Sequence, residues 1–143
     1  MGHSITTNTE RMTFHGIDPV LQRGDAYSKE RQDCTVHATS IAAQIPYYQA
    51  HDLLARFGRS PRHGIRYLSF VRDLRERVGA YRIERVHMPE TVTLAKFLRD
   101  FPKGRFVVRK SGHVFAVIDG IQYDSLPNSP RVRITHIYHF VKD

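Results

Sequence analysis

The chain has only one cysteine among its 143 residues, so it cannot close an internal disulfide. This cysteine content gives no indication of an oxidising compartment. No apolar run approaches the length of a membrane-spanning helix, and the N-terminal stretch MGHSITTNTERMTF lacks the apolar core of a signal peptide. We therefore expect a cytoplasmic protein that does not associate with a membrane.

Motifs for binding phosphate and nucleic acid are also missing. The loop GRSPRHG, residues 58–64, lacks the Walker pattern of a phosphate-binding loop. No segment combines aromatic and basic residues in the way that an RNA-recognition sheet does. The chain has no internal repeat and no low-complexity segment. Specific recognition of nucleic acid is therefore not expected.

The composition is typical of a globular protein with a basic surface. Apolar residues make up 41% of the chain and aromatic residues 10%, which suits one folded domain over residues 1–143. Residues 1–30 are a weakly patterned N-terminal segment. The net charge of +8 has two interpretations: a solvated basic face, or a surface that meets phosphates or an acidic protein. A local cluster of arginines contributes to it: Arg56, Arg59, Arg62 and Arg66.

Hydrophobic periodicity divides the chain into a helical first part and a β second part. The pattern predicts helices over residues 33–45, 46–57, 67–78 and 91–101, with short strands at 11–17 and 80–86. Further strands are predicted over residues 105–110, 113–118, 121–123 and 131–141, joined by tight turns at Ser111-Gly112 and Asp119-Gly120. Helices come first and antiparallel strands last, which predicts an α+β fold.

The Asp119-Gly120 dipeptide sets the register of one predicted hairpin. Asp-Gly between alternating apolar strands is typical of a two-residue hairpin turn. With these residues as the loop, Phe115 pairs with Asp124, and His113 lies two residues before Phe115 on the same face. Diagonal neighbours on one face are about 7–8 Å apart, within reach of an aromatic side chain. The sequence therefore predicts that His113 and Asp124 lie side by side.

The single cysteine, Cys34, follows Asp33, which we expect to cap the first helix. A thiol in the first turn of a helix faces the positive end of the helix dipole and free N–H groups, which lower its pKa. A nearby histidine and carboxylate would complete the set of nucleophile, base and orienting group for nucleophilic catalysis. Alternatively, Cys34 is a buried residue without chemistry, or it forms half of a metal site with His37. No second Cys/His pair completes such a site, so no metal is expected.

Three stretches of the sequence resemble the papain-like cysteine peptidases. They are QDCTVHATSIA, PYYQAHDLLARFGR and LAKFLRDFPKGRFVVRKSGHVFAVIDGIQYDS, and together they cover most of residues 31–125. The closest likeness is to the bacteriocin-leader-processing peptidase domains and their small phage and bacterial relatives. The resemblance implies N-terminal helices, with the nucleophile helix packed on a C-terminal antiparallel sheet. It also implies Cys34 as nucleophile, His113 as general base and acid, and Asp124 as the residue that orients His113.

The resemblance extends to the groups around the nucleophile, with one departure. The family carries a glutamine six residues before the cysteine, where it helps to hold the oxyanion, and this chain has Ser28 there. The nearest glutamine is Gln32, which we assign to the oxyanion site with the Cys34 N–H. A missing oxyanion donor costs about 10²–10³ in rate. The expected substrate-binding residues come from the 58–64 loop and the turn before His113: Arg59, Arg62, His63, Gly64 and Gly112.

These observations favour a cysteine peptidase or related thiol hydrolase that cleaves a peptide or isopeptide bond without a cofactor. Its partner would be a peptide or protein substrate, in the host cytoplasm if the chain is phage-encoded. The alternative is an inactive papain-like binding module whose arginine-rich surface binds nucleic acid or an acidic host protein. A third interpretation is a phage protein that manipulates a host factor, by cleavage or by blocking an interface.

The catalytic interpretation makes geometric predictions. The first helix should present Cys34 against the face of the sheet that carries His113 and Asp124. The Cys34 sulfur should lie roughly 3–4 Å from one imidazole nitrogen. A carboxylate oxygen of Asp124 should lie about 2.6–3.2 Å from the other nitrogen. The three groups should open onto a cleft rimmed by the 58–64 loop, because a sealed site could not admit a peptide.

Overall fold

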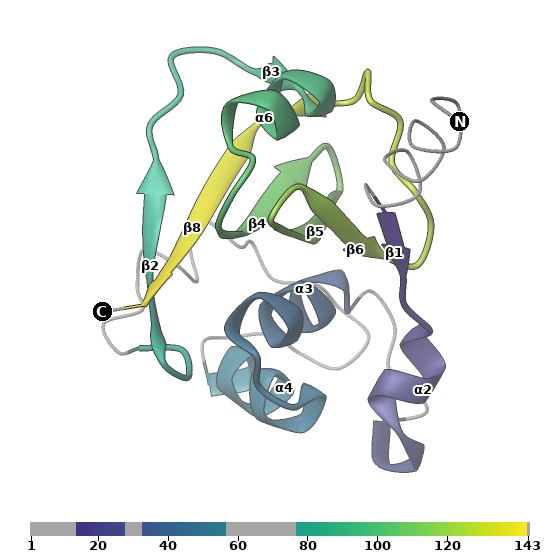
Figure 1. Ribbon diagram of the computed structural model, residues 1–143. Coiled ribbons are helices and arrows are strands. Elements are labelled where there is room, and N and C mark those ends of the chain that lie inside the picture. The colour runs from purple at the N-terminus through teal and green to yellow at the C-terminus, as the bar shows by residue number, and fades with distance from the viewer. Residues whose placement is uncertain (1–13, 28–32, 57–76, 143) are drawn as a thin grey trace, which may run out of the picture.

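A six-stranded mixed sheet runs through the computed structural model, which describes residues 14–27, 33–56 and 77–142 (Figure 1). The strand order is β1-β6-β5-β4-β8-β2. A two-stranded sheet of β3 and β7 lies beside α6. The strands are β1 (Phe14–Gly16), β2 (Tyr81–Val86), β3 (Val92–Thr93), β4 (Arg105–Lys110), β5 (His113–Ile118), β6 (Ile121–Asp124), β7 (Arg133–Ile134) and β8 (His136–Lys142). The helices are α2 (Pro19–Arg23), α3 (Cys34–Ala43), α4 (Tyr47–Arg56) and α6 (Leu94–Asp100), with a 3-10 turn at Asp25–Tyr27.

The sheet separates two apolar clusters, and side-chain alternation along the strands assigns each residue to one of them. Helices α3 and α4 cover one face, and α6 packs on the other. The α3 face carries Val107, Val114, Ala116, Tyr138 and Phe140, and the α6 face carries Phe106, Val108, Phe115, Val117 and Ile137. The mixed α/β architecture agrees with the predicted α+β class.

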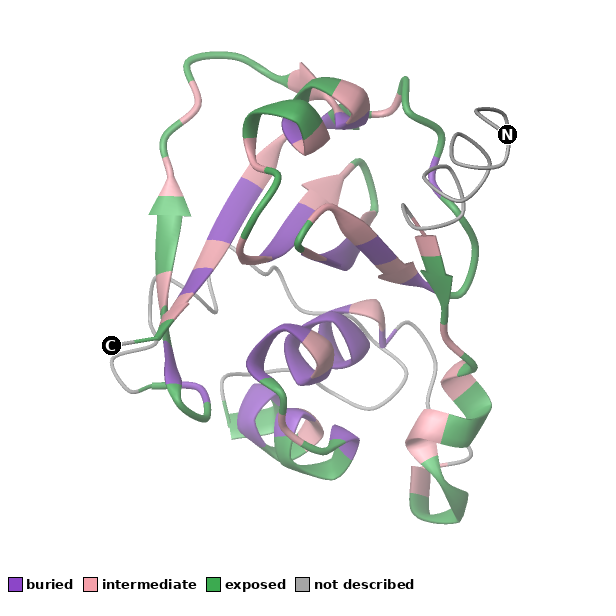
Figure 2. Cartoon of the chain, in the orientation of Figure 1, coloured by how far each residue is buried: buried purple, intermediate pink, exposed green. Residues whose placement is uncertain are grey.

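Helix α3 is buried almost all round, as its colouring in Figure 2 shows. Its sequence CTVHATSIAA is rich in small side chains, which allow α4 and strand β5 to approach it closely. Gln44 ends the helix in a left-handed conformation, with φ 55° and ψ 46°. Helix α4 then begins directly after Pro46, as predicted, because proline is well tolerated at the start of a helix.

The β5–β6 hairpin has the predicted turn and register. Asp119 and Gly120 have φ values of 50° and 80°, the positive values that a type I′ hairpin turn requires. Ile118 pairs with Ile121 across the turn, and the pairing continues to Ala116 and Tyr123. The predicted pair of Phe115 with Asp124, one step further, is not part of the β5–β6 ladder. The Asp119 carboxylate accepts a hydrogen bond of 2.9 Å from the Gly104 N–H, which ties the turn to the chain before β4.

Two predictions about the sheet and one about a helix were wrong. The sheet is mixed and not only C-terminal, because β1 from the weakly patterned N-terminal segment pairs in parallel with β6, and β2 pairs with β8. The predicted strand over residues 131–141 is two strands, interrupted at Thr135, whose N–H donates to the Arg109 carbonyl at 2.8 Å. At the end of the predicted 67–78 helix, Val78 forms a β-bridge with Tyr81 instead. The first ten residues of that helix lie outside the described residues.

No helix within the described residues is both long and apolar enough to cross a membrane.

Candidate active site

Cys34 is the first residue of α3, as predicted from the sequence, and its thiol is half-buried. Burial alone raises the pKa of this thiol. A hydrogen bond with His113 and the backbone N–H groups of Val114 and Thr35 act in the opposite direction and lower the pKa below its ordinary value of 9.0. These donors favour the thiolate because each of them stabilises negative charge on the sulfur.

His113 begins β5 and Asp124 ends β6, and their side chains meet beyond the point where the two strands pair. His113 Nε2 lies 2.7 Å from Asp124 Oδ2, within the predicted range. This hydrogen bond, together with the one to Cys34, raises the pKa of His113 from 6.5 to about 9. Because Nε2 is engaged by Asp124, Nδ1 is the ring nitrogen left for the thiol.

Asp124 is held by groups other than His113. Burial raises the pKa of this carboxyl, but hydrogen bonds from His113, Asn128 and the Ser125 N–H outweigh it and lower the pKa below 3.8. Asn128 Nδ2 donates to Asp124 Oδ2 at 3.0 Å, and its N–H donates to Gln122 Oε1 at 3.0 Å. The sequence carried no signal for Asn128, because this contact depends on how the loop after β6 folds back.

One geometric prediction for the site was wrong. Helix α3 packs on the sheet face that carries Val114 and Ala116, whereas His113 belongs by alternation to the opposite face and stacks on Phe115 at 5.9 Å. Pairing between β5 and β6 ends at Ala116. The thiol therefore reaches the imidazole past the unpaired end of β5, at the N-terminus of α3, and not across the face of the sheet.

The three side chains line one pocket of about 200 Å³. The residues that share it include Arg23 from α2, Tyr123 from β6 and Ile17, which follows β1. Gly112 precedes His113 in an exposed turn with φ 74° and is not part of the pocket lining. The other predicted substrate-binding residues lie outside the described residues: Arg59, Arg62, His63 and Gly64. Gln32, predicted for the oxyanion site, and Ser28, which stands where the family has its glutamine, lie outside them as well.

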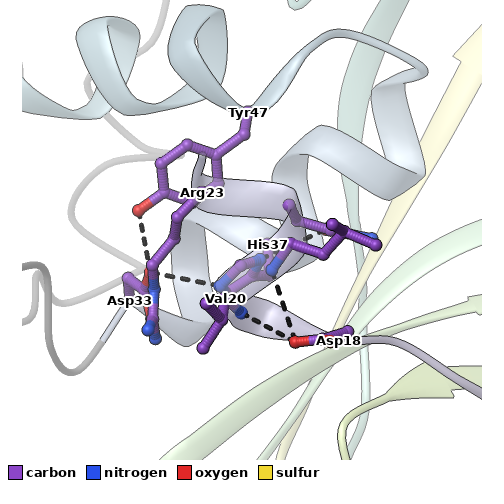
Figure 3. A network of polar contacts seen from close by, with 8 residues as sticks. Asp18, Val20, Arg23, Asp33, His37 and Tyr47 are labelled. Carbon is purple, nitrogen blue, oxygen red and sulfur yellow. Dashed lines mark hydrogen bonds and ion pairs between the residues drawn. The ribbon is translucent and has the colours of Figure 1, made fainter. Parts of the chain in front are cut away.

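Asp33 forms a buried polar network directly before Cys34, and Figure 3 shows Arg23, His37 and Tyr47 converging on it. Arg23 donates from Nε and Nη2 at 2.7 and 2.8 Å, and the Tyr47 hydroxyl donates at 2.7 Å. His37 Nε2 lies 3.1 Å from the carboxylate. Burial raises the pKa of Asp33, but these partners outweigh it and hold the pKa far below its usual range.

This network corrects the expectation for Asp33 and gives His37 polar partners other than Cys34. Asp33 occupies the N-cap position of α3, but its side chain makes no capping hydrogen bond, because Arg23 and Tyr47 bind both of its oxygens. His37 points to Asp33 on one side and to Gln22 Oε1, at 3.2 Å, on the other. In the described part of the chain, no three His, Cys, Asp or Glu side chains gather closely enough to hold a metal ion.

No protein-family model matches the chain, and searches of curated proteins and of solved structures found no significant match. The site is therefore interpreted from its own geometry. The His113 imidazole lies between the Cys34 thiol and the Asp124 carboxylate. Both neighbours raise the pKa of the imidazole.

Proposed function

We propose that the chain is a cysteine peptidase or related thiol hydrolase of papain-like fold, which cleaves a peptide or isopeptide bond with Cys34, His113 and Asp124. One observation carries the proposal. His113 is hydrogen-bonded to Asp124 at 2.7 Å and to the thiol of the only cysteine, within one pocket. A structural cysteine needs no such partners, since buried cysteines generally behave as small apolar residues.

The two pKa shifts favour an ion pair as the resting state. The pKa of Cys34 is lowered and that of His113 is raised to about 9. The opposite shifts favour the proton on the imidazole over the proton on the sulfur, giving a thiolate and an imidazolium. Asp124 is ionised and stabilises the imidazolium through Nε2, so that Nδ1–H points to the sulfur. A thiolate prepared in this way is a strong nucleophile.

The proposed reaction follows from this charge state. The Cys34 thiolate attacks the substrate carbonyl carbon, forming a C–S bond and an oxyanion. His113 then gives its proton to the amine nitrogen, the C–N bond breaks, and a thioester remains on Cys34. His113 next takes a proton from water, the resulting hydroxide attacks the thioester, and the acid product leaves as the thiolate and imidazolium form again. Asp124 stays ionised throughout and holds the ring orientation.

The start of α3 supplies a donor for the oxyanion. The first N–H groups of a helix have no acceptor inside the helix, and the Cys34 N–H is one of them. We assign this N–H to the oxyanion, together with Gln32.

The order of the three groups supports the papain-like part of the proposal. The nucleophile starts an early helix, and the base and its orienting carboxylate follow on neighbouring strands of the sheet. The parallel strand β1 and strand β2, which pairs with the C-terminal strand β8, extend this arrangement at the two edges of the sheet. We further propose that the protein acts in the cytoplasm.

A thiol-reactive peptide probe tests the function directly. Because Cys34 is the only cysteine, any thiol labelling reports on it alone. We expect the native chain to be labelled at pH 6–7, Cys34→Ala not at all, and His113→Ala at a strongly reduced rate. His139→Ala is the matched control, since His139 in β8 stacks on Phe106 of β4, which packs in the cluster on the α6 face of the sheet. Labelling of the native chain no faster than that of a free thiol would support the inactive binding module instead.

A further inference from the structure

Basic side chains line the sheet in a row that starts beside the candidate active site. Val114, whose N–H binds the Cys34 sulfur, pairs with Arg109 of β4, and Arg109 pairs with His136 of β8. Directly opposed residues project to the same face of a sheet. Arg85 of β2 pairs with Tyr138, two residues beyond His136, so it also projects to this face.

A second pocket, of about 270 Å³, lies at the far end of this row. It is lined by Arg85, Val86, His87, Met88, Thr135 and His136. Burial lowers the pKa of His136, and the positive charges of Arg85 and Arg109 lower it further. Within the described residues, neither arginine forms an ion pair with a carboxylate. Arg85 lines the pocket, and Arg109 lies outside its lining but close enough to lower the pKa of His136. The described part of the fold thus leaves the positive charge of two arginines uncompensated at and beside the pocket.

We propose that Arg85, Arg109 and His136 form a subsite for an acidic side chain of the substrate peptide, three residues from the scissile bond. This inference rests on the proposed function. Neighbouring strands are about 4.8 Å apart, so His136 in β8 lies roughly 10 Å from β5 across β4. An extended peptide advances about 3.3 Å per residue. A peptide crossing the strands from Cys34 therefore brings its third residue to the pocket.

The size of the pocket favours a side chain over a nucleic acid. Pockets for small ligands span about 300–1,000 Å³, so a pocket of about 270 Å³ suits one or two carboxylate side chains. Arg109 is half-buried and its Nη1 lies 3.5 Å from Thr135 Oγ1. A partly fixed guanidinium suits a planar carboxylate better than it suits the many exposed phosphates of a nucleic-acid backbone.

Binding to an inactive chain tests the subsite independently of catalysis. Fluorescent octapeptides of glutamate and of glutamine are titrated by anisotropy into Cys34→Ala at physiological ionic strength. We expect the glutamate peptide to bind more tightly than the glutamine peptide. Adding Arg85→Gln and Arg109→Gln should weaken binding of the glutamate peptide about tenfold, as for the loss of two partly exposed ion pairs. The matched control carries Arg99→Gln and Arg131→Gln, which remove the same charge from exposed positions elsewhere. Because Arg85 is exposed, Arg85→Glu alone provides a further variant that keeps the fold.

A protection assay on the native chain tests the link to the thiol. The glutamate octapeptide should slow alkylation of Cys34 by iodoacetamide, and free glutamate at the same carboxylate concentration should not. Equal loss of binding in both double variants would overturn the subsite. The subsite would also be overturned if a single-stranded oligonucleotide bound more tightly than the glutamate octapeptide and lost this binding in the Arg85→Gln and Arg109→Gln variant. Binding without protection would show a site unrelated to the substrate. If the peptide binds and protects but no bond is cleaved, the proposed function fails while the acidic-peptide site stands.

Discussion

Removing the Arg23 guanidinium tests the buried network that precedes the thiol. In Arg23→Gln the Asp33 carboxylate, 4% exposed, loses two hydrogen bonds of 2.7 and 2.8 Å. The Tyr47 hydroxyl and His37 remain close to it. The carboxylate then keeps its charge in a buried position with fewer donors. We expect the free energy of unfolding to fall and the pKa of the adjacent Cys34 thiol to rise, because the negative charge beside the thiolate is no longer offset.

The size of the loss follows from the geometry. Removing one partner of a buried ion pair costs about 3–5 kcal/mol. Arg23 is 15% exposed and two other partners of Asp33 remain, so we expect a value at the lower end, about 3 kcal/mol. Asp33→Asn should cost about 2 kcal/mol, since the charge left over belongs to an arginine that reaches solvent. The double variant should lose about 3 kcal/mol rather than the sum, because the two groups act on each other.

Urea unfolding of the four proteins at pH 7 measures these values. Lys96→Gln is the matched control, because Lys96 forms an exposed ion pair with Asp100 at 2.9 Å, of the kind worth about 0.3–0.5 kcal/mol. The lowered pKa of Asp33 means that its stabilisation is present above its unfolded pKa and fades as the pH falls below about 4. The gap between the native chain and Asp33→Asn should therefore narrow in acid. A loss below about 1 kcal/mol for Arg23→Gln, or additive losses in the double variant, would refute the reasoning.

Four further outcomes are expected. Alkylation of Cys34 should reach a plateau at neutral pH and rise again near pH 9, where His113 loses its proton; a single rise above about pH 8 would contradict the ion pair. In Asp124→Asn the second rise should move down toward pH 6.5, and an unchanged profile would show that Asp124 does not set the His113 pKa. His113→Ala should reduce peptide turnover about 10²–10⁴-fold in a kinetic assay, and a smaller loss would argue against general base catalysis. Asp119→Ala should cost about 1–2 kcal/mol in urea unfolding, from strain at φ 50° and the lost bond to Gly104, while Cys34 alkylation stays unchanged.

The sequence predicted the features of the site that depend on local rules. The Asp119-Gly120 turn dictates its own backbone conformation and hence the register of β5 and β6. This register was enough to place Asp124 beside His113. Cys34 was placed at a helix start because the hydrophobic pattern changes there and Pro46 limits the helix at its other end. Each of these predictions needed only a few neighbouring residues.

Features that depend on distant segments could not be predicted in the same way. The parallel pairing of β1 with β6 joins residues more than 100 positions apart. A short strand in a polar segment has no hydrophobic pattern from which its partner strand could be predicted. Asp33 was expected to cap α3, because an N-cap is the local use of an aspartate. The structure places Arg23 and Tyr47 against it instead, and such tertiary partners override local preference. The position of the α3 N-terminus beside the end of β5 likewise depends on how the helix packs on the sheet. It could not be predicted from the alternation of side chains along β5 alone.

The order of the elements along the chain has a consequence for the protein as it is being made. About 90 residues separate Cys34 from Asp124, and a ribosome needs about 5–20 s to add them. The α3 segment emerges early, but the His113 imidazole and the Val114 N–H that lower its thiol pKa arrive only with strand β5, and the Asp124 carboxylate that holds the imidazole arrives with β6. Strand β1, although first to emerge, finds its β6 partner only then as well. On a nascent chain the thiol is therefore an ordinary one, and its activation coincides with closure of the sheet around the finished hairpin.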